Sequence, residues 1–308
     1  SERGNGRRLD QVAAELFESF SRSRLQEWIR AGALTVDGVP ADRPRLRLEG
    51  GETLRLQARL EAAGQDRPEA IELEILHQDA AVLIVNKPPG LVVHPGAGNR
   101  AGTLVNALLH HDPGLGALPR AGIVHRLDKD TSGALLVART PAAHRRLVAA
   151  MQAREIERRY EALVFGAMVA GGSVDAPIAR HRIDRKRMAV VENGRSALTH
   201  YRVRGRYPGV THVAIRLQTG RTHQIRVHMA HIDYPVLGDP VYGGRGRVPA
   251  GCGEVLREAI RGFPRQALHA ERLAFAHPAS GERIEVRAPR PVDLQALIEA
   301  LQAARGDA

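Results

Sequence analysis

Hydrophobic residues recur at helical spacing near the start of the chain. Between Leu9 and Phe20 they fall at every third or fourth position, which predicts an amphipathic helix, and a second such segment follows at once. An Asp37-Gly38 pair then lies between two short apolar runs, and this dipeptide is typical of a tight β-hairpin. Residues 1–62 are therefore expected to form a small domain of two helices and a short sheet.

Strand-like runs outnumber helical segments in the rest of the chain. Residues 63–70 contain Gly and Pro but no large apolar side chain, so we expect a linker there. Beyond it, strands and helices do not alternate one for one, which predicts an α+β domain with a mostly antiparallel sheet over residues 71–308. The expected helices span residues 103–111, 141–154, 222–232 and 291–304, and the expected strands span residues 71–76, 81–85, 159–165, 196–204, 210–217, 268–275 and 282–287.

One polar stretch, residues 122–133, lies between two apolar runs. Its sequence is GIVHRLDKDTSG, in which charged residues, His, Thr and Ser are concentrated. Binding and catalytic residues are often placed on such a loop when strands hold it rigidly, although a charged surface hairpin has the same appearance. The pattern alone leaves both interpretations open.

The chain carries an excess of positive charge. It has 45 Lys and Arg against 34 Asp and Glu, a formal net charge of +11, and nearly all of the positive charge is Arg. This excess favours a polyanionic partner, usually nucleic acid. Residues 1–65 hold 11 Arg and 10 acidic residues, so any nucleic-acid binding by this part depends on Arg side chains clustering on one face.

Cysteine content and hydropathy exclude several classes of protein. The single cysteine, Cys252, excludes an intramolecular disulfide framework and a multi-cysteine metal site. No run approaches the roughly 20 apolar residues of a membrane span, and no signal segment opens the chain, so we expect a cytoplasmic protein without a membrane partner. No dinucleotide-binding or Walker motif is present, and Ser132 lacks the sequence context of a hydrolase nucleophile.

Three histidines offer an alternative chemistry. His223, His228 and His231 could share part of a helix face and bind a metal, as in a metal-dependent nucleic-acid hydrolase. No HExxH pattern supports this interpretation, and the neighbouring Arg221 and Arg226 would repel a cation. We therefore expect no metal site.

Four sequence blocks stand in a fixed order along the larger domain. They are NKPPGLVVHP at 86–95, HRLDKDTSG at 125–133, RYEAL at 159–163 and GRTHQIRVHMA at 220–230. Together they closely resemble the RluA-type pseudouridine synthases over nearly the whole of residues 71–308. Residues 1–62, with SRSR near the start of the second helix, resemble the S4 RNA-binding module, so the chain is most similar to S4-containing members that act on large-subunit ribosomal RNA.

The resemblance implies isomerisation of specific uridines to pseudouridine in a helical stem-loop of large-subunit ribosomal RNA, either free or within a pre-50S particle. The uracil detaches from C1′, rotates and rejoins through C5, so the resemblance implies no cofactor, and the target base must be flipped out of the RNA. We expect a monomer, because no long exposed apolar pattern demands a partner. Two alternatives stay open: a synthase acting on tRNA, and an S4-containing ribosome-assembly factor whose catalytic site is idle.

The resemblance also implies three catalytic residues. Asp128, the first aspartate of HRLDKD, matches the family's essential carboxylate. By the family pattern, Arg221 is expected beside Asp128, where it would hold the carboxylate ionised and aimed. Tyr160 is expected to stack on the base and to offer its phenolic group for proton transfer. Whether Asp128 attacks the sugar, attacks the base or removes a proton from C2′ is open at this stage.

Basic residues at three places along the chain are expected to contact RNA. Two of them precede Asp128 and are expected to contact the flipped nucleotide, and others surround the start of the second helix, where free N–H groups favour phosphate. The segment 180–187, RHRIDRKR, is expected to be a mobile hairpin that grips the RNA backbone. The predicted RNA-contacting residues are His125, Arg126, Arg22, Arg24, Arg30, Arg182, Arg185, Lys186 and Arg187.

Overall fold

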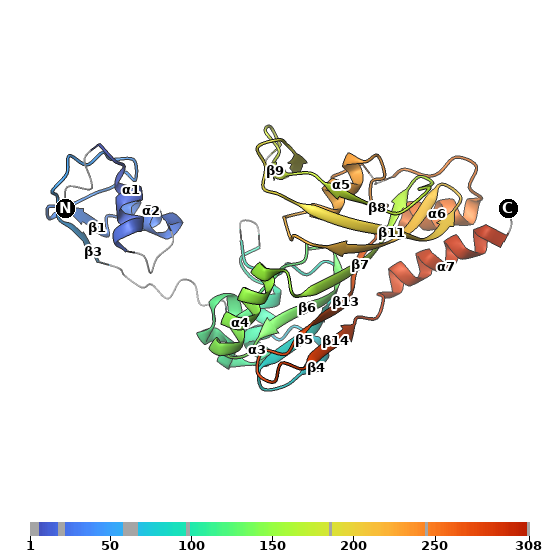
Figure 1. Cartoon of the computed structure of the whole chain (residues 1–308), viewed down its shortest axis with the longest axis horizontal. Coiled ribbons are helices and arrows are strands. Elements are labelled where there is room, and N and C mark those ends of the chain that lie inside the picture. The colour runs from blue at the N-terminus through green and yellow to red at the C-terminus, as the bar shows by residue number, and fades with distance from the viewer. Residues whose placement is uncertain are drawn as a thin grey trace. The chain divides into compact units, whose positions relative to one another are not determined.

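The chain divides into two compact units, Ser1–Gln65 and Asp66–Ala308, each with its own hydrophobic core (Figure 1). The predicted linker, residues 63–70, lies partly outside the residues whose structure is described. The computed structural model of the chain describes residues 6–17, 22–57, 67–96, 99–184, 187–243 and 246–306.

The first unit consists of two helices and a three-stranded antiparallel sheet, as the sequence predicts. Leu9 and Leu25 from the helices and Leu34 from the sheet form its buried core. The predicted hairpin is confirmed, because Asp37 and Gly38 both have positive φ, as a tight hairpin turn requires. The elements are α1 (Leu9–Leu16), α2 (Arg22–Arg30), β1 (Leu34–Val36), β2 (Val39–Pro40) and β3 (Leu54–Leu56), with strand order β2-β1-β3.

A mixed sheet organises the second unit. Its strand order is β4-β5-β6-β13-β7-β12-β11-β8, with β14 paired to β13. Among these strands only β6 and β13 run parallel, which confirms the predicted α+β class with a mostly antiparallel sheet. The strands are β4 (Glu74–Gln78), β5 (Val82–Lys87), β6 (Ser132–Ala138), β7 (Glu157–Phe165), β8 (Gly172–Asp175), β11 (Leu198–Tyr207), β12 (Val210–Leu217), β13 (Leu268–Ala276) and β14 (Arg283–Arg287), and a separate hairpin pairs β9 (Ile178–Arg180) with β10 (Met188–Val190).

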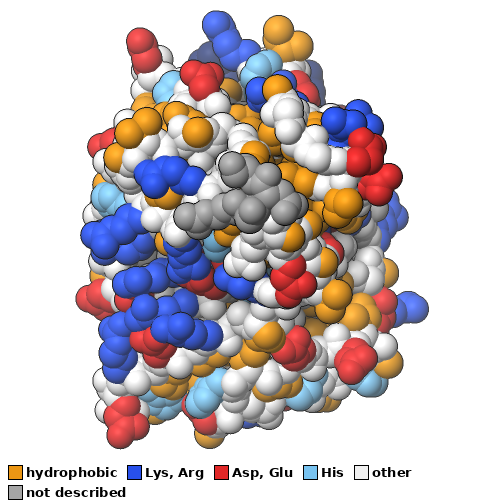
Figure 2. Space-filling view, turned by 90° about the vertical axis from the view of Figure 1, so that its right-hand side faces the viewer, with side chains coloured by type: hydrophobic (Ala, Val, Ile, Leu, Met, Phe, Trp, Pro, Cys, Tyr) orange, Lys and Arg blue, Asp and Glu red, His pale blue; other side chains and the backbone are white. Residues whose placement is uncertain are grey.

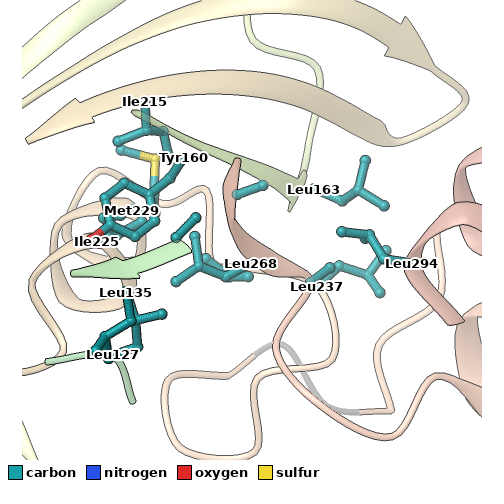
Figure 3. Packing of buried hydrophobic residues seen from close by; sticks show 14 of the residues in the cluster. Leu127, Leu135, Tyr160, Leu163, Ile215, Ile225, Met229, Leu237, Leu268 and Leu294 are labelled. Carbon is teal, nitrogen blue, oxygen red and sulfur yellow. The ribbon is translucent and has the colours of Figure 1, made fainter. Parts of the chain in front are cut away.

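Helices pack on both faces of this sheet, because the helix at residues 141–153 packs with Leu136 of β6 in a core separate from the one that contains Ile225 and Met229. Figure 3 shows Ile225 and Met229 of one helix beside Tyr160 of β7, and Leu294 of another beside Leu163 of the same strand. Within the described residues, no helix has the length and apolar character needed to cross a membrane. The helices are α3 (Leu104–His111), α4 (Pro141–Ala153), α5 (Gln224–His231), α6 (Glu254–Gly262) and α7 (Val292–Gly306), and 3-10 turns span Pro113–Ala117 and Pro119–Gly122.

A buried carboxylate on β7, on the strand face opposite to Tyr160, ties the sheet to the segment before α7. Glu161 accepts hydrogen bonds from Arg290 Nε at 2.7 Å, from Arg290 Nη2 at 2.9 Å and from His212 Nε2 at 3.0 Å. Burial alone would raise the pKa of Glu161, but the hydrogen bonds from His212 and Arg290 outweigh it and lower the pKa to about 2.

Glu161 should therefore make folding stability depend on pH. Because its pKa is lower in the folded chain than in the unfolded one, its contribution is complete above the ordinary value of 4.5 and is lost as the pH falls toward 2. A shift of this size corresponds to about 3 kcal/mol. Urea unfolding of wild type and Glu161→Gln should show a difference in the free energy of unfolding that shrinks from neutral pH down to about pH 3. A difference that stays constant over this range would contradict the assignment.

Candidate active site

The charged loop before β6 is fixed by glycines at both of its ends. Gly122 and Gly133 have φ values of 78° and 114°, and a Cβ on either would overlap the backbone of Ala138 or Ala270. The neighbouring strands therefore determine where this loop places Asp128.

Lys87, the last residue of β5, ties the same loop to the turn that follows β5. Its Nζ donates to the carbonyl oxygens of Pro88 at 2.7 Å, Leu91 at 2.9 Å and Lys129 at 2.9 Å, so all three ammonium protons are used. The side chain is fully buried. Because Lys129 directly follows Asp128, Lys87 fixes the backbone next to the carboxylate, a role that the sequence patterns did not predict.

Asp128 is paired with Arg226 and not with Arg221. Arg226 Nη1 donates to Asp128 Oδ2 at 3.1 Å, while its Nε and Nη2 donate to the two carboxylate oxygens of Asp239 at 2.6 and 2.9 Å. The predicted pairing of Arg221 with Asp128 is therefore wrong. Arg226 lies within α5 and is only 4% exposed, whereas Arg221 precedes the helix and donates its Nε–H to the carbonyl of Ser196 at 3.0 Å.

Asp239 and Tyr242 hold the Arg226 guanidinium from behind. Asp239 is fully buried, and its Oδ1 also accepts the backbone N–H groups of Val241 at 2.8 Å and Tyr242 at 3.1 Å. The guanidinium carbon lies 5.1 Å from the centre of the Tyr242 ring. Burial opposes the charge of Arg226, but hydrogen bonds and attraction from the two aspartates outweigh it and raise its pKa. Asp128 thus faces a permanent cation, which pairs with its carboxylate and orients it.

Tyr160 closes the buried end of the site. It lies on β7, is 4% exposed, and its ring sits beside Ile225 and Met229 of α5 (Figure 3). Burial raises the pKa of Tyr160, so the phenol stays protonated near neutral pH. Because Tyr160 and Asp128 line the same cavity, the structure brings these two predicted residues together.

The cavity has an outer part of about 520 Å³ and an inner part of about 50 Å³. Asp128, Tyr160, Leu217 and Arg221 line both parts, and Arg226 lines the inner one. Arg221 is therefore part of the predicted site, although it does not pair with the carboxylate. The arginines that line the outer part are Arg126, Arg154, Arg158 and Arg221.

His125 and Arg126, which are predicted to contact the flipped nucleotide, both line the outer cavity, and His125 also makes a structural contact. Its Nε2 accepts the backbone N–H of Leu136 at 3.0 Å, so the proton of the neutral ring is on Nδ1. Burial, with a smaller contribution from the nearby Arg158 cation, lowers the pKa of His125 to about 3, which keeps the ring neutral. Its Nδ1 is buried and has no hydrogen-bond partner among the described atoms. The side chain of Arg126 is exposed.

The geometry does not support the metal-dependent alternative. His228 is buried, and both of its ring nitrogens are occupied, Nδ1 with Thr199 Oγ1 at 2.8 Å and Nε2 with the carbonyl of Ala176 at 2.9 Å. It therefore has no free nitrogen to share a ligand set with His223 and His231. Within the described ranges, no group of three His, Cys, Asp or Glu side chains is placed to hold a metal ion.

The first unit arranges part of its basic surface around a buried carboxylate. Asp10 is fully buried and accepts hydrogen bonds from Arg8, Arg22 and Gln26. The structure thus fixes Arg22, a predicted RNA contact, whereas the side chain of Arg24 lies outside the described residues. A cavity of about 540 Å³ beside this cluster is lined by Arg8, Arg30, Arg43 and Arg45.

The hairpin expected at the basic segment is present and lies beside the active site. β9 and β10 pair antiparallel on either side of this segment. Arg187 lies with its guanidinium carbon 5.5 Å from the centre of the Tyr242 ring, which also contacts Arg226, and Arg182 is exposed. The hairpin is therefore packed against the group that holds Asp128. Two predicted RNA contacts, Arg185 and Lys186, lie outside the described residues.

Comparison with protein families and with curated proteins gives consistent matches. A family model described as RNA pseudouridylate synthase matches residues 81–231, and an S4 domain model matches residues 7–54. Ribosomal large subunit pseudouridine synthase D of Xanthomonas campestris pv. campestris is 57% identical over 297 residues, which cover 96% of this chain and 89% of that protein. The Escherichia coli protein of the same name is 51% identical over 303 residues, which cover 98% of this chain and 93% of that protein.

Two solved human structures share the fold. Human RNA Pseudouridylate Synthase Domain Containing 4 has a TM-score of 0.60 and 26% sequence identity, and the match covers 74% of this chain and 93% of that one. Human RNA Pseudouridylate Synthase Domain Containing 1 has a TM-score of 0.56 and 30% identity, with coverage of 77% and 96%. The chain therefore belongs to the RNA pseudouridylate synthase family and carries an S4 domain in its first unit.

Proposed function

We propose that this chain converts specific uridines of large-subunit ribosomal RNA to pseudouridine. The observation that carries the proposal is the Asp128 carboxylate, paired with Arg226 beside Tyr160 in a cavity lined by arginines. Two relatives named as large-subunit pseudouridine synthases, 57% and 51% identical over nearly the whole chain, support the choice of RNA. We also propose that the protein acts as a monomer, because one chain supplies all three of these residues, and that it works in the cytoplasm, because its proposed substrate is ribosomal RNA.

The reaction needs a fixed carboxylate and a shielded base. The bond between C1′ and N1 breaks, the uracil turns, C5 bonds to C1′, C5 loses its proton and N1 gains one, so atoms balance without a cofactor. Asp128 supplies a carboxylate oxygen at the ribose, and Arg226 pairs with that carboxylate and holds its orientation. Tyr160 lines the inner cavity beside Asp128, where its ring is placed to contact the uracil.

Several basic surfaces support binding of a structured RNA. The exposed Arg126 lines the cavity that must receive a flipped uridine. Figure 2 shows Lys and Arg side chains gathered on the left of that view, among fewer acidic ones. The basic hairpin of the second unit and the arginine-lined cavity of the S4 unit each offer further positive charge to RNA phosphates.

The S4 unit should contribute affinity rather than catalysis. Arg30→Gln combined with Arg45→Gln should weaken RNA binding and lower the slope of log Kd against log salt by about 2, one for each lost phosphate contact, with little change in the rate at saturating RNA. Filter binding from low to physiological salt measures the slope. Arg55→Gln is the matched control, because Arg55 is exposed on β3 outside this cavity. An unchanged slope in the double variant would remove the S4 cavity from the RNA interface.

The hydroxyl of Tyr160 should matter for the rate and not for binding. Tyr160→Phe keeps the ring against Ile225 and Met229 but removes the group that could transfer a proton, so single-turnover conversion should slow by roughly 10²-fold. RNA affinity and thermal stability should stay close to wild type. Conversion at the wild-type rate would leave Tyr160 with a stacking role only.

Release of tritium from RNA labelled at uridine C5 tests the proposed function. The wild-type protein should release tritium from large-subunit ribosomal RNA and not from small-subunit ribosomal RNA or tRNA, and EDTA should have no effect. Binding without release would favour the ribosome-assembly alternative. Release from tRNA alone would favour a tRNA-directed synthase.

A further inference from the structure

Arg158 is a buried guanidinium without a partner among the described residues. It lies on β7 two positions before Tyr160, so both side chains project from the same face of the strand. It is 7% exposed, its Nε is buried, and no described atom accepts a hydrogen bond from it. Burial of an unpaired charge is costly and calls for an explanation. Because Arg158 lines the outer cavity, a partner can arrive with the substrate.

The fold reserves space for this guanidinium. A Cβ added to Gly220 would lie 2.6 Å from Arg158 Nη1, too close for the present position of the side chain. The backbone of Gly220 is not in the left-handed region, so glycine is not required there for its conformation. The absent side chain of Gly220 therefore leaves room for Arg158.

A second buried donor faces the same cavity. His125 Nδ1 carries the proton of a neutral ring, because Nε2 accepts the Leu136 N–H, and Nδ1 likewise has no partner among the described atoms. The one carboxylate among the lining residues is Asp128, which is already paired with Arg226. The outer cavity thus presents unpaired donors and positive charge, which suits a ligand with anionic oxygens.

A phosphate fits this site better than the uracil does. The base is neutral until its bond to C1′ breaks, whereas every nucleotide of RNA carries a charged phosphate from the first encounter. Arg154 and Arg221 line the same outer cavity, so its positive charge is permanent. The detached uracil would carry a single negative charge, and only during the reaction. A permanent cluster of cations matches a permanent anion.

We propose that Arg158, together with the Nδ1–H of His125, binds a backbone phosphate next to the target uridine and so holds its ribose against Asp128. The inference rests on the proposed function for the identity of the RNA. It assigns Arg158 as a binding and positioning residue, separate from the Asp128 and Arg226 pair.

A functional-group cycle tests this contact. The substrate is a large-subunit RNA fragment, prepared with a neutral methylphosphonate in place of the phosphodiester either 5′ or 3′ of the converted uridine. Arg158→Gln should weaken binding of the unmodified fragment by roughly 10- to 100-fold, as expected for loss of a charged hydrogen bond. At one of the two linkages, the methylphosphonate should weaken RNA binding to wild type by about the same factor as Arg158→Gln does. At that linkage, Arg158→Gln should bind the methylphosphonate RNA as tightly as it binds the unmodified RNA.

Three variants separate position from charge. Arg159→Gln removes the same charge from the opposite face of β7, where Arg159 pairs with Glu157, so its effect should be small and additive with the methylphosphonate. Gly220→Ala keeps the charge but displaces the guanidinium, so affinity should fall with Arg158 intact. Arg158→Lys should restore part of the affinity.

Thermal unfolding of the free protein distinguishes binding from a structural role. Because Arg158 has no partner among the described residues of the free protein, Arg158→Gln should leave the melting midpoint unchanged or raise it. A clear drop would assign Arg158 to the fold and overturn the proposal.

Two further results would overturn it. One is additivity of Arg158→Gln with the methylphosphonate at both linkages, and the other is slower conversion with an unchanged Kd, which would place Arg158 on the detached uracil. Conversion of the unmodified fragment by wild type is measured separately. Additive effects on Kd together with normal conversion would refute the role of Arg158 and leave the proposed function standing, whereas absent conversion would refute the proposed function whatever the Kd values show.

Discussion

Asp128→Asn should abolish pseudouridine formation while RNA binding stays close to wild type. The amide keeps the size of the carboxylate and can still accept the hydrogen bond from Arg226 Nη1, but it has no ionised oxygen to offer at the ribose. Loss of a group of this kind lowers rates by roughly 10²–10⁴-fold or more. Single-turnover tritium release measures the rate, and filter binding measures the affinity.

Asp130→Asn is the matched control for this experiment. Asp130 lies two residues away in the same loop but does not line the cavity, and its backbone carbonyl, which accepts a hydrogen bond from Arg265, is unchanged by the substitution. It should convert uridine at close to the wild-type rate. Wild-type conversion by Asp128→Asn, or equal loss in both variants, would remove Asp128 from the chemistry.

Arg226→Gln should cost both activity and stability. It removes the cation beside Asp128 and leaves the fully buried Asp239 without its partner. Breaking a buried pair in this way costs about 3–5 kcal/mol. Urea unfolding measures the free energy of unfolding, and conversion is compared at temperatures where the variant is folded. Arg221→Gln, which loses a hydrogen bond to the carbonyl of Ser196, should be much less destabilising.

A double variant separates the two effects of Arg226. Arg226→Met combined with Asp239→Asn removes both members of the buried pair and should recover part of the lost stability. Activity should stay absent, because Asp128 still lacks its cation. Activity that returns with stability would show that Arg226 only supports the fold.

The fold could largely be predicted from hydrophobic spacing. The long strands β7 and β12 contain consecutive apolar residues or alternate apolar and polar residues over most of their length. In the closing helix α7, apolar residues recur at helical spacing. The helix α6 was missed although Leu256 and Ile260 recur at helical spacing and are buried, so the signal was available. The strands β8, β9 and β10 span only three or four residues, too few for a periodicity to be read.

The pairing inside the site was harder to predict than its members. Arg221 and Arg226 lie in one sequence block, and the choice between them depends on where the helix begins. The sequence predicts a start at residue 222, but α5 begins at Gln224 after His223, which has a φ of 55°. That left-handed residue turns the chain, so Arg226 faces the loop with Ile225 buried beside it. A positive φ at His223 has no signature in the sequence.

The supporting residues depend on contacts between distant segments. Lys87 bonds the carbonyl of Lys129, and Arg226 bonds Asp239, across separations that no local pattern reveals. Arg158 is similar, because its neighbour Arg159 has the same charge but points to the opposite face of β7 and pairs with Glu157. Alternation along the strand indicates which of the two shares a face with Tyr160. Only the tertiary structure shows that Arg158 is buried and that no atom in the described ranges accepts a hydrogen bond from its Nε.

Mapping of pseudouridines in ribosomal RNA from cells that lack this protein tests the central claim most directly. Cells are complemented with wild type, with Asp128→Asn or with an empty vector. Specific pseudouridines of the large-subunit RNA should be absent without the protein, return with wild type and stay absent with Asp128→Asn at equal protein abundance. An unchanged large-subunit map in cells lacking the protein, or full restoration by Asp128→Asn, would contradict the account.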